Sequence, residues 1–192
     1  MARMTTPNVA NLLTYFRLAA VPFFIVAFAL GWHTVAFLLF TLAGISDLID
    51  GYVARRQQLH SEIGALLDPI ADKLLMGATF IALGTVHIIP WWFVVLMLCK
   101  DVLILSGIAY FKYARVPFHY GSIFWSKATT LLLIVIGASA LLDLSFPGIA
   151  LGGTYPIGDF IAVGVYIIAV LMVVTALEYV RQGIELLARH HR

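Results

Sequence analysis

The sequence has very few charged residues and a single cysteine. Only 11% of its 192 residues are Asp, Glu, Lys or Arg, and 62% are hydrophobic, whereas a soluble domain has about 25% charged and about 45–50% apolar residues. This balance argues against a soluble globular domain. The lone Cys99 excludes disulfides and cysteine-rich metal sites and is expected to be a packing residue. The net charge of +2 is too small to indicate a nucleic-acid partner.

Long apolar segments fill most of the chain. A helix that crosses a bilayer needs about 20 mostly apolar residues, and its backbone groups must be paired internally because lipid offers no partners. Six such segments predict an all-α integral membrane protein, a single domain over residues 1–192 with six transmembrane helices. The expected spans are residues 12–30, 34–53, 69–89, 91–111, 123–144 and 157–180.

The basic residues outside these spans all fall on one side of the predicted bundle. That side holds both termini, the connection from the second to the third span and the connection from the fourth to the fifth. Its basic residues are Arg3, Arg55, Arg56, Lys112, Arg115, Arg181, Arg189 and Arg192. Because cytoplasmic connections of membrane proteins are enriched in Lys and Arg, both termini are expected to be cytoplasmic. Trp91 and Trp92, next to Pro90, fit an aromatic belt at the opposite interface.

Four aspartates are spaced to lie on the faces of two neighbouring helices. Asp47 and Asp50 are three residues apart near the end of the second span, and Asp68 and Asp72 are four apart at the start of the third. Spacings of three and four place residues on one helix face. A short connection joins the two helices, so we expect antiparallel neighbours whose acidic faces meet at the cytoplasmic end.

Four clustered carboxylates would repel one another unless cations bind between them. A donor set made only of oxygen selects Mg²⁺ or Mn²⁺, and four carboxylates can hold two ions, which suits displacement at phosphorus. The small Gly51 and Ala54 allow close approach to the backbone, and Arg55 offers a planar fork for phosphate oxygens. The pattern therefore indicates a metal-bound pyrophosphate. The alternatives are acids that only pair helices and acids that line a proton or cation pathway.

The same residues carry a resemblance to a known family. Asp47, Asp50, Gly51, Ala54 and Arg55, then eight residues, then Gly64, Asp68 and Asp72 follow the pattern D-x2-D-G-x2-A-R-x8-G-x3-D-x3-D. This pattern resembles the complete signature of the CDP-alcohol phosphotransferases, with no position altered. Membrane prenyltransferases also use paired Asp motifs with Mg²⁺, but their two motifs are widely separated and their helices more numerous.

The resemblance implies a phospholipid-synthesising transferase that moves the phosphatidyl group of CDP-diacylglycerol onto an alcohol hydroxyl and releases CMP. It implies that Asp47, Asp50, Asp68 and Asp72 bind two divalent ions, with Asp72 also the general base. The residues implied to contact the nucleotide and pyrophosphate are Asn11, Thr14, Asp47, Gly51, Ala54, Arg55 and Gly64. It further implies a homodimer in a bacterial inner membrane, with the site at the cytoplasmic face.

Three polar residues recur at every third position near the start of the first span. Asn11, Thr14 and Arg17 resemble an N-x2-T-x2-R opening found in phosphatidyl-transferring members. Capping or hydrogen bonding to the helix backbone explains Asn11 and Thr14 equally well. Arg17 lies about 9 Å beyond Asn11 at about 1.5 Å per residue, so it needs an anionic partner or must extend outwards to the interface.

The identity of the acceptor alcohol is less constrained. The first span and the acid motif resemble members that use glycerol 3-phosphate, which is the acceptor we expect, whereas the fourth span resembles cardiolipin synthases, which use phosphatidylglycerol. Lys112, Arg115 and Lys127 are candidates for binding an acceptor phosphate. Lys127 has an equal explanation as a cytoplasmic-edge lysine. Lys73 is expected to neutralise neighbouring acids, and Lys100 with Asp101 to make an ionic contact with another helix.

Overall fold

The computed structural model describes residues 9–57, 62–113, 124–147, 150–151 and 155–190 of the chain. Side chains are described for most of these residues. The exceptions are residues 9–16, 47–57, 62–72, 108, 112, 124, 126–127, 150–151, 155–156 and 187–190. Six helices make up nearly all of this part of the chain. They are α1 (Val9–Ala29), α2 (His33–Gln57), α3 (Glu62–Thr85), α4 (Trp91–Tyr113), α5 (Phe124–Ser145) and α6 (Ile157–His190).

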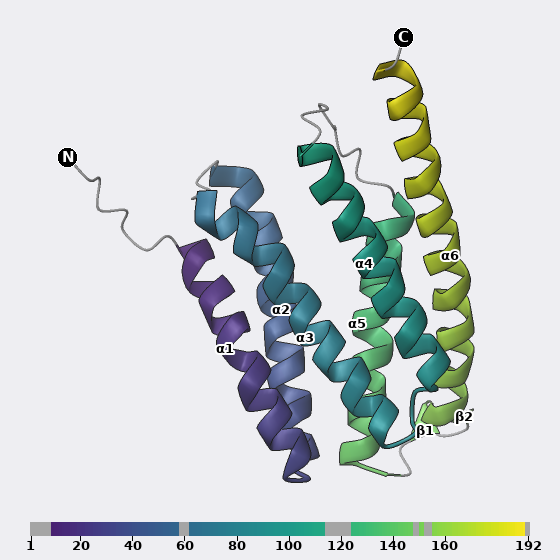
Figure 1. Cartoon of the computed structure of the whole chain (residues 1–192). Coiled ribbons are helices and arrows are strands. Elements are labelled where there is room, and N and C mark those ends of the chain that lie inside the picture. Colours follow the sequence, from purple (N-terminus) through teal and green to yellow (C-terminus); the bar gives the residue numbers. More distant parts are fainter. Residues whose placement is uncertain (1–8, 58–61, 114–123, 148–149, 152–154, 191–192) are drawn as a thin grey trace, which may run out of the picture.

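Successive helices run in opposite directions. In Figure 1 both termini lie at the upper end of the bundle, with the end of α2, the start of α3, the end of α4 and the start of α5. The turns from α1 to α2 and from α3 to α4 lie at the lower end. The prediction that both termini share one end with the second and fourth connections agrees with this arrangement.

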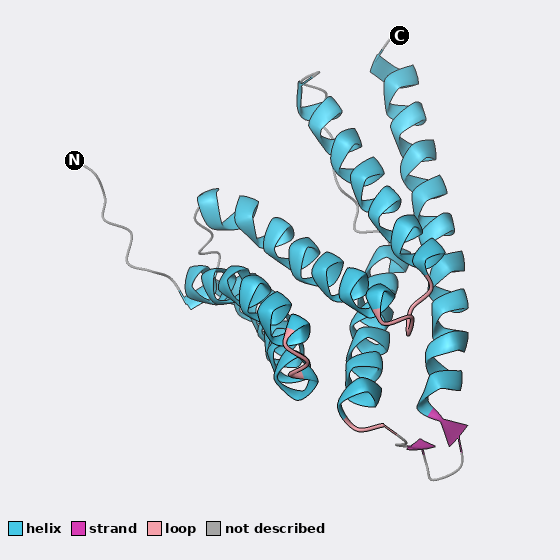
Figure 2. Cartoon of the chain, turned by 60° about the horizontal axis from the view of Figure 1, so that its bottom comes forward, coloured by secondary structure: helices cyan, strands magenta, loops and turns pink. Residues whose placement is uncertain are grey.

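The helices form two groups of three that share one core. α1 packs against α2 and α3, and α6 packs against α4 and α5, while α2 and α3 contact α5. Figure 2 shows α3 passing from the first group towards the second. At the centre, a Cβ added to Gly137 of α5 would lie 3.1 Å from Cζ of Phe40 on α2. The glycine therefore makes room for a buried aromatic ring.

Two lower turns end their helices in the same way. Trp32 N–H donates to Ala27 O and Gly31 N–H donates to Phe28 O, with Gly31 at φ 76°. His87 takes the corresponding place after α3, at φ 60°, where its N–H donates to Gly84 O. A left-handed residue at this position stops a helix and satisfies its last carbonyl groups. These turns return the chain into the bundle after only a few residues.

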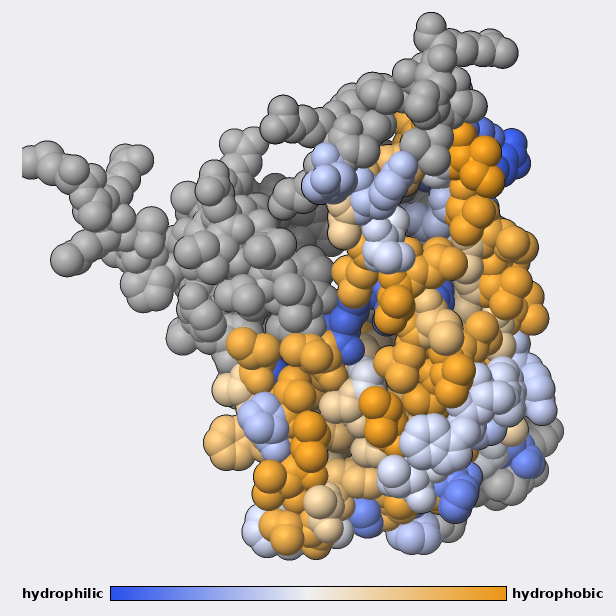
Figure 3. Space-filling model, in the orientation of Figure 1, coloured by the Kyte–Doolittle hydropathy of each residue, from blue (hydrophilic) through white to orange (hydrophobic). Residues whose placement is uncertain are grey.

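The surface of the described part is strongly apolar. Figure 3 shows orange side chains over most of the visible face, with paler residues towards the lower end. Trp32, Trp91 and Trp92 are exposed near that lower end, as an aromatic belt requires. Of the described helices, α4, α5 and α6 are long and apolar enough to cross a membrane, over Trp91–Phe111, Ala128–Ser145 and Ile157–Leu186. The described parts of α1, α2 and α3 contain shorter apolar segments.

Several details differ from the sequence prediction. α3 starts at Glu62, seven residues before the expected span, because hydropathy marks where a helix is apolar and not where it begins. Cys99 is exposed on α4 and is not a core residue. A short ribbon not anticipated from the sequence, β1 (Ala150–Leu151) paired with β2 (Tyr155–Pro156), precedes α6.

Candidate active site

The acidic motif lies on two antiparallel helices that meet at the upper end of the bundle in Figure 1. The second half of α2 carries Asp47, Asp50, Gly51, Ala54 and Arg55, and the first half of α3 carries Gly64, Asp68 and Asp72. α2 ends at Gln57 and α3 begins at Glu62. The short connection predicted from the sequence therefore joins two helices that both carry the motif.

The helix bounds place the acids in two levels. Asp50 lies about 10 Å from the end of α2, and Asp68 about 9 Å from the start of α3, at about 1.5 Å per residue. Asp47 and Asp72 both lie about 15 Å from those ends by the same rise. Measured along the helices from the connection, Asp50 therefore matches Asp68 and Asp47 matches Asp72. This register suits two ions held between two helices.

On α3 the acid positions continue the buried face of the helix. Thr79, Phe80 and Leu83 are fully buried, and Leu75 and Met76 nearly so. Asp72 precedes Leu75, Met76, Thr79 and Leu83 by three, four, seven and eleven residues, which are the spacings of one helix face. Asp68 is one turn earlier. The backbone register of α3 therefore puts both positions on the interior side.

On α2 the acid positions likewise continue the buried face of the helix. Ala36, Phe40 and Ala43 form the buried stripe of this helix. Asp47 follows Ala43 by four residues and Asp50 follows Asp47 by three, so the alternating steps of four and three continue without a break. By helix register, both acid-bearing stripes therefore continue the buried faces of α2 and α3 towards the upper end.

The side chains of these acids lie outside the described residues. Among the residues whose side chains are described, no group of three or more His, Cys, Asp or Glu could hold a metal. The donor set of the motif consists of four carboxylates with no thiol or imidazole, which fits the hard ions Mg²⁺ and Mn²⁺. The matching distances along the helices and the interior register are consistent with that fit.

The other predicted contact residues lie on helix ends. Asn11 and Thr14 are in the first two turns of α1, Lys112 is in the last turn of α4 and Lys127 is in the first turn of α5. All four positions belong to the upper end of the bundle in Figure 1. Their side chains lie outside the described residues, as does Arg115 entirely. Their roles stay predictions.

Arg17 of α1 is buried in the protein and does not extend to the interface. Its side chain is 1% exposed, on the face that also carries Ala20, Phe24 and Ala27. This face packs against α2 and α3, because these are the helices that α1 contacts most extensively. Of the two alternatives drawn from the sequence, the outward-reaching arginine is therefore wrong.

An ionic cluster links α3 to α4. Lys73 Nζ lies 2.7 Å from Asp101 Oδ1, and Lys100 Nζ lies 3.2 Å from the same oxygen. All three side chains are partly buried. The expected ionic contact of Asp101 with another helix is confirmed, and the partner is Lys73. Lys73 thus neutralises an acid of α4, and its effect on the motif acids stays a prediction because their side chains lie outside the described residues.

Three buried hydroxyl groups on the motif helices were missed by the sequence reasoning. Thr41 Oγ1 and Ser46 Oγ on α2 and Thr79 Oγ1 on α3 are buried and have no hydrogen-bond partner in the described part of the chain. By contrast, Thr129 and Thr175 on α5 and α6 donate to backbone oxygens four residues earlier. The sequence gives little indication of the unpartnered hydroxyls, since a single hydroxyl within an apolar helix usually donates to the backbone of its own helix.

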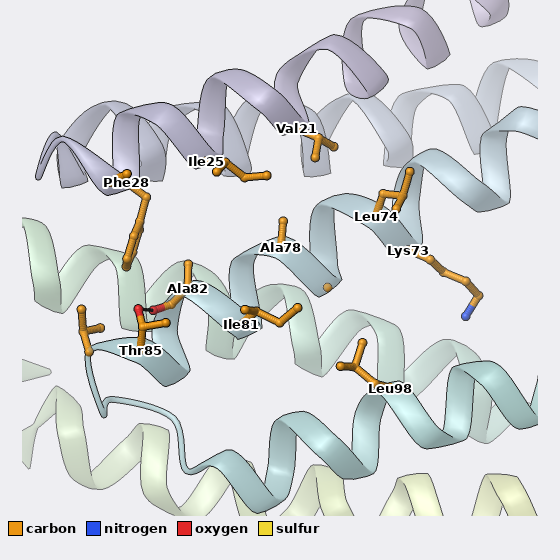
Figure 4. A pocket seen from close by; sticks show the side chains of 13 residues that line it. Val21, Ile25, Phe28, Lys73, Leu74, Ala78, Ile81, Ala82, Thr85 and Leu98 are labelled. Atoms are coloured by element: carbon orange, nitrogen blue, oxygen red, sulfur yellow. Dashed lines mark hydrogen bonds between the residues drawn. The ribbon is translucent and has the colours of Figure 1, made fainter.

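An apolar groove of about 730 Å³ runs along the outer side of α3 between α1 and α4. Figure 4 shows Val21, Ile25 and Phe28 of α1 facing α3 across it, with Leu98 of α4 on the other side. Lys73 stands at one end and Thr85 at the other. Among the described lining residues Lys73 is the one charged side chain, and most of the others are apolar. This lining suits acyl chains or another apolar helix.

The family profile described as CDP-alcohol phosphatidyltransferase matches residues 7–177, which include the whole motif. The chain belongs to this family. Members of the CDP-alcohol phosphatidyltransferase family depend on divalent metal ions, in agreement with the carboxylate donor set. The family prediction made from the residues of α2 and α3 is confirmed.

Curated proteins similar to this chain are named either for phosphatidylglycerophosphate synthesis or for cardiolipin synthesis. A Mycobacterium tuberculosis protein named as a phosphatidylglycerophosphate synthase is 41% identical over 106 residues, 52% of this chain and 51% of that relative. A Salmonella paratyphi A protein named CDP-diacylglycerol–glycerol-3-phosphate 3-phosphatidyltransferase is 43% identical over 88 residues, 44% of this chain and 48% of the relative. These matches span about half of each relative. A Mycobacterium bovis protein named as a cardiolipin synthase is 33% identical over 96% of this chain and 90% of its own length.

Proposed function

We propose that this CDP-alcohol phosphatidyltransferase moves the phosphatidyl group of CDP-diacylglycerol onto the hydroxyl of an acceptor alcohol, with release of CMP. The observation that carries the proposal is the unbroken motif on the interior faces of α2 and α3, within a chain that matches the family over residues 7–177. A proton or cation transporter would not need Gly51, Ala54 and Arg55 beside the acids. It would also distribute its acids through the membrane depth.

The residues of the chain supply binding and proton transfer. Asp72 accepts the proton of the acceptor hydroxyl, whose oxygen forms the new bond to the phosphorus that carries diacylglycerol. The bond from that phosphorus to CMP breaks, and Arg55 binds the phosphate oxygens that gain charge. Gly51 and Ala54 let the nucleotide lie close to α2, with Asn11, Thr14 and Gly64 beside it.

Asp47, Asp50, Asp68 and Asp72 hold two divalent ions, Mg²⁺ or Mn²⁺, in this proposal. When bound, such ions neutralise the diphosphate and stabilise the charge that develops on the leaving group. The support is the all-carboxylate donor set and the matching distances of the acids along α2 and α3 from the connection between these helices.

The proposed acceptor is glycerol 3-phosphate, with Lys112, Arg115 and Lys127 binding its phosphate. The higher identities belong to relatives named for glycerol 3-phosphate or phosphatidylglycerophosphate. One observation favours phosphatidylglycerol as a second candidate. The relative that matches nearly the whole chain is named as a cardiolipin synthase.

We further propose that all six helices cross the bacterial inner membrane, with both termini and the site on the cytoplasmic side. The alternating helix directions and the basic residues at the upper end support this orientation. The homodimer is a prediction from the family resemblance, and chemical cross-linking in native membranes tests it.

The test offers the purified protein CDP-diacylglycerol and Mg²⁺ with one acceptor at a time. Glycerol 3-phosphate, phosphatidylglycerol, inositol phosphate and serine are compared by CMP release and by mass spectrometry of the lipid product. We expect phosphatidylglycerophosphate from glycerol 3-phosphate. Cardiolipin from phosphatidylglycerol alone would select the second candidate.

Asp68→Asn and Asp72→Asn are the matched variants for this assay. Each should lower turnover at least about 10³-fold, because each removes a metal ligand or the base. Asp143, far from the motif at the end of α5, supplies the control Asp143→Asn, which should keep full activity. Full turnover in both motif variants, or cation flux without CMP release in sealed proteoliposomes, would overturn the proposal.

A further inference from the structure

Arg17 is the most deeply buried charged side chain in the described part of the chain, and the proposed mechanism does not use it. Its side chain is 1% exposed, and it interacts with at least one other residue. A guanidinium taken out of water needs an anionic partner, because an isolated buried charge is too costly to retain. The position of that partner decides the role of Arg17.

The helices around Arg17 offer few anions. The buried face of α1 packs mainly against α2 and α3, and α1 itself contains no acid. The acids of α2 are Asp47 and Asp50, and those of α3 are Glu62, Asp68 and Asp72. Asp101 of α4 already accepts Lys73 and Lys100. Glu62 is the first residue of α3, at the outer end of that helix.

The depth of Arg17 also fits the acid site. Arg17 lies about 12 Å from the start of α1 at about 1.5 Å per residue, and the four aspartates lie about 9–15 Å from the ends of α2 and α3. All three helix ends belong to the upper end of the bundle in Figure 1. Arg17 therefore lies on a helix that packs against both acid-bearing helices, towards the same end of the bundle as the acids.

We infer that Arg17 supplies a fixed positive charge from α1 to the acid site, pairing with the motif carboxylates and, when the donor lipid is bound, with its diphosphate. This role rests on the proposed function, because it assumes that the acids hold divalent ions and a diphosphate. Arg17 thus adds a third helix to a site that the motif alone confines to α2 and α3.

A fixed positive charge should weaken the binding of a divalent cation and strengthen the binding of a diphosphate. It competes with a divalent cation for the carboxylates and attracts a diphosphate. Loss of the charge should therefore tighten metal binding in the absence of nucleotide and weaken binding of the donor. Loss of packing alone would weaken both. The opposite signs separate a charge at the site from a purely structural residue.

The experiment compares the full-length protein with Arg17→Gln in detergent. Mn²⁺ binding without nucleotide is followed by electron paramagnetic resonance, and the KM for CDP-diacylglycerol is measured in the transfer assay. We expect Mn²⁺ to bind about tenfold more tightly and the KM to rise about tenfold, the size expected of a unit charge within about 10 Å at an effective dielectric constant of about 20. Arg17→Lys, which keeps the charge, should bind Mn²⁺ like the unaltered protein.

Arg181→Gln is the matched control, since Arg181 is 82% exposed and pairs with Glu185 on α6. It should change neither quantity. Unchanged or weaker Mn²⁺ binding by Arg17→Gln, with the unaltered protein binding Mn²⁺ normally, would overturn the role of Arg17. Failure of the unaltered protein to bind Mn²⁺ would instead overturn the proposed metal site, and the role of Arg17 with it.

Discussion

At the residue scale, the buried cations of this protein have different uses. Lys73 and Lys100 share Asp101, which ties α3 to α4 next to the motif. Arg17 lies on the opposite side of α3, on a helix without any acid. Lys73 is therefore paired with an acid outside the motif.

Because Lys73 and Lys100 share the carboxylate of Asp101, substitutions of Asp101 and of Lys73 should lower the stability of the fold by different amounts. Asp101→Asn leaves two lysines without an anion and should destabilise the fold by about 2 kcal/mol, less than a fully buried pair would cost. Lys73→Met leaves Lys100 paired and should cost about 1 kcal/mol or less. Thermal unfolding in detergent measures both.

Glu185→Gln on α6 is the control, because its partner Arg181 is exposed. An exposed pair of this kind contributes less than about 0.5 kcal/mol. Equal losses for Asp101→Asn and Lys73→Met would show that Asp101 serves only one lysine.

At the element scale, close helix contacts depend on individual glycines. A Cβ added to Gly164 of α6 would clash with Cδ1 of Ile136 on α5. Ile136 is itself almost fully buried. Its side chain must therefore shift within a packed core before even one methyl group fits. The spacing of α5 and α6, which support α2 and α4, is set at this contact.

Gly164→Ala should destabilise the protein by about 1–3 kcal/mol, because overpacking forces side chains out of their preferred rotamers. Adding Ile136→Val removes the closest atom and should recover part of the loss. Gly107→Ala on α4 is the matched control, since no atom lies within 4 Å of its added Cβ. Chemical unfolding in detergent checks the three variants, and equal stability of Gly164→Ala and Gly107→Ala would refute the close contact.

At the scale of the whole molecule, the two ends of the bundle differ. The lower end carries tight turns and three of the four exposed tryptophans, and the upper end carries the motif, Trp125 and most of the basic residues. α6 has 34 residues, about 50 Å at about 1.5 Å per residue, which is longer than the roughly 30 Å hydrocarbon core. Its exposed pair of Arg181 and Glu185 shows that the excess length lies at the upper end.

The orientation of the two ends in the membrane is tested by labelling single cysteines in sealed inner-membrane vesicles. The native cysteine is first removed by Cys99→Ala. Gln58→Cys and Arg192→Cys should react with a membrane-impermeant maleimide from the cytoplasmic side, and Trp32→Cys only from the opposite side. The physical reason is that Lys and Arg in connections are retained in the cytoplasm. Labelling of Gln58→Cys and Arg192→Cys from opposite sides would contradict an even number of crossings between them.

The sequence alone determined the helices, their alternating directions and the acid motif, because hydropathy and residue spacing are local properties of the chain. The residue spacing of the motif also identifies the family. What only the tertiary structure decided is how each helix is rotated and which helices touch. Arg17 is buried, Lys73 binds Asp101 of α4, and Gly164 meets Ile136, because packing between distant segments sets helix rotation and separation. An apolar helix can bury any of its faces, so composition leaves that choice open.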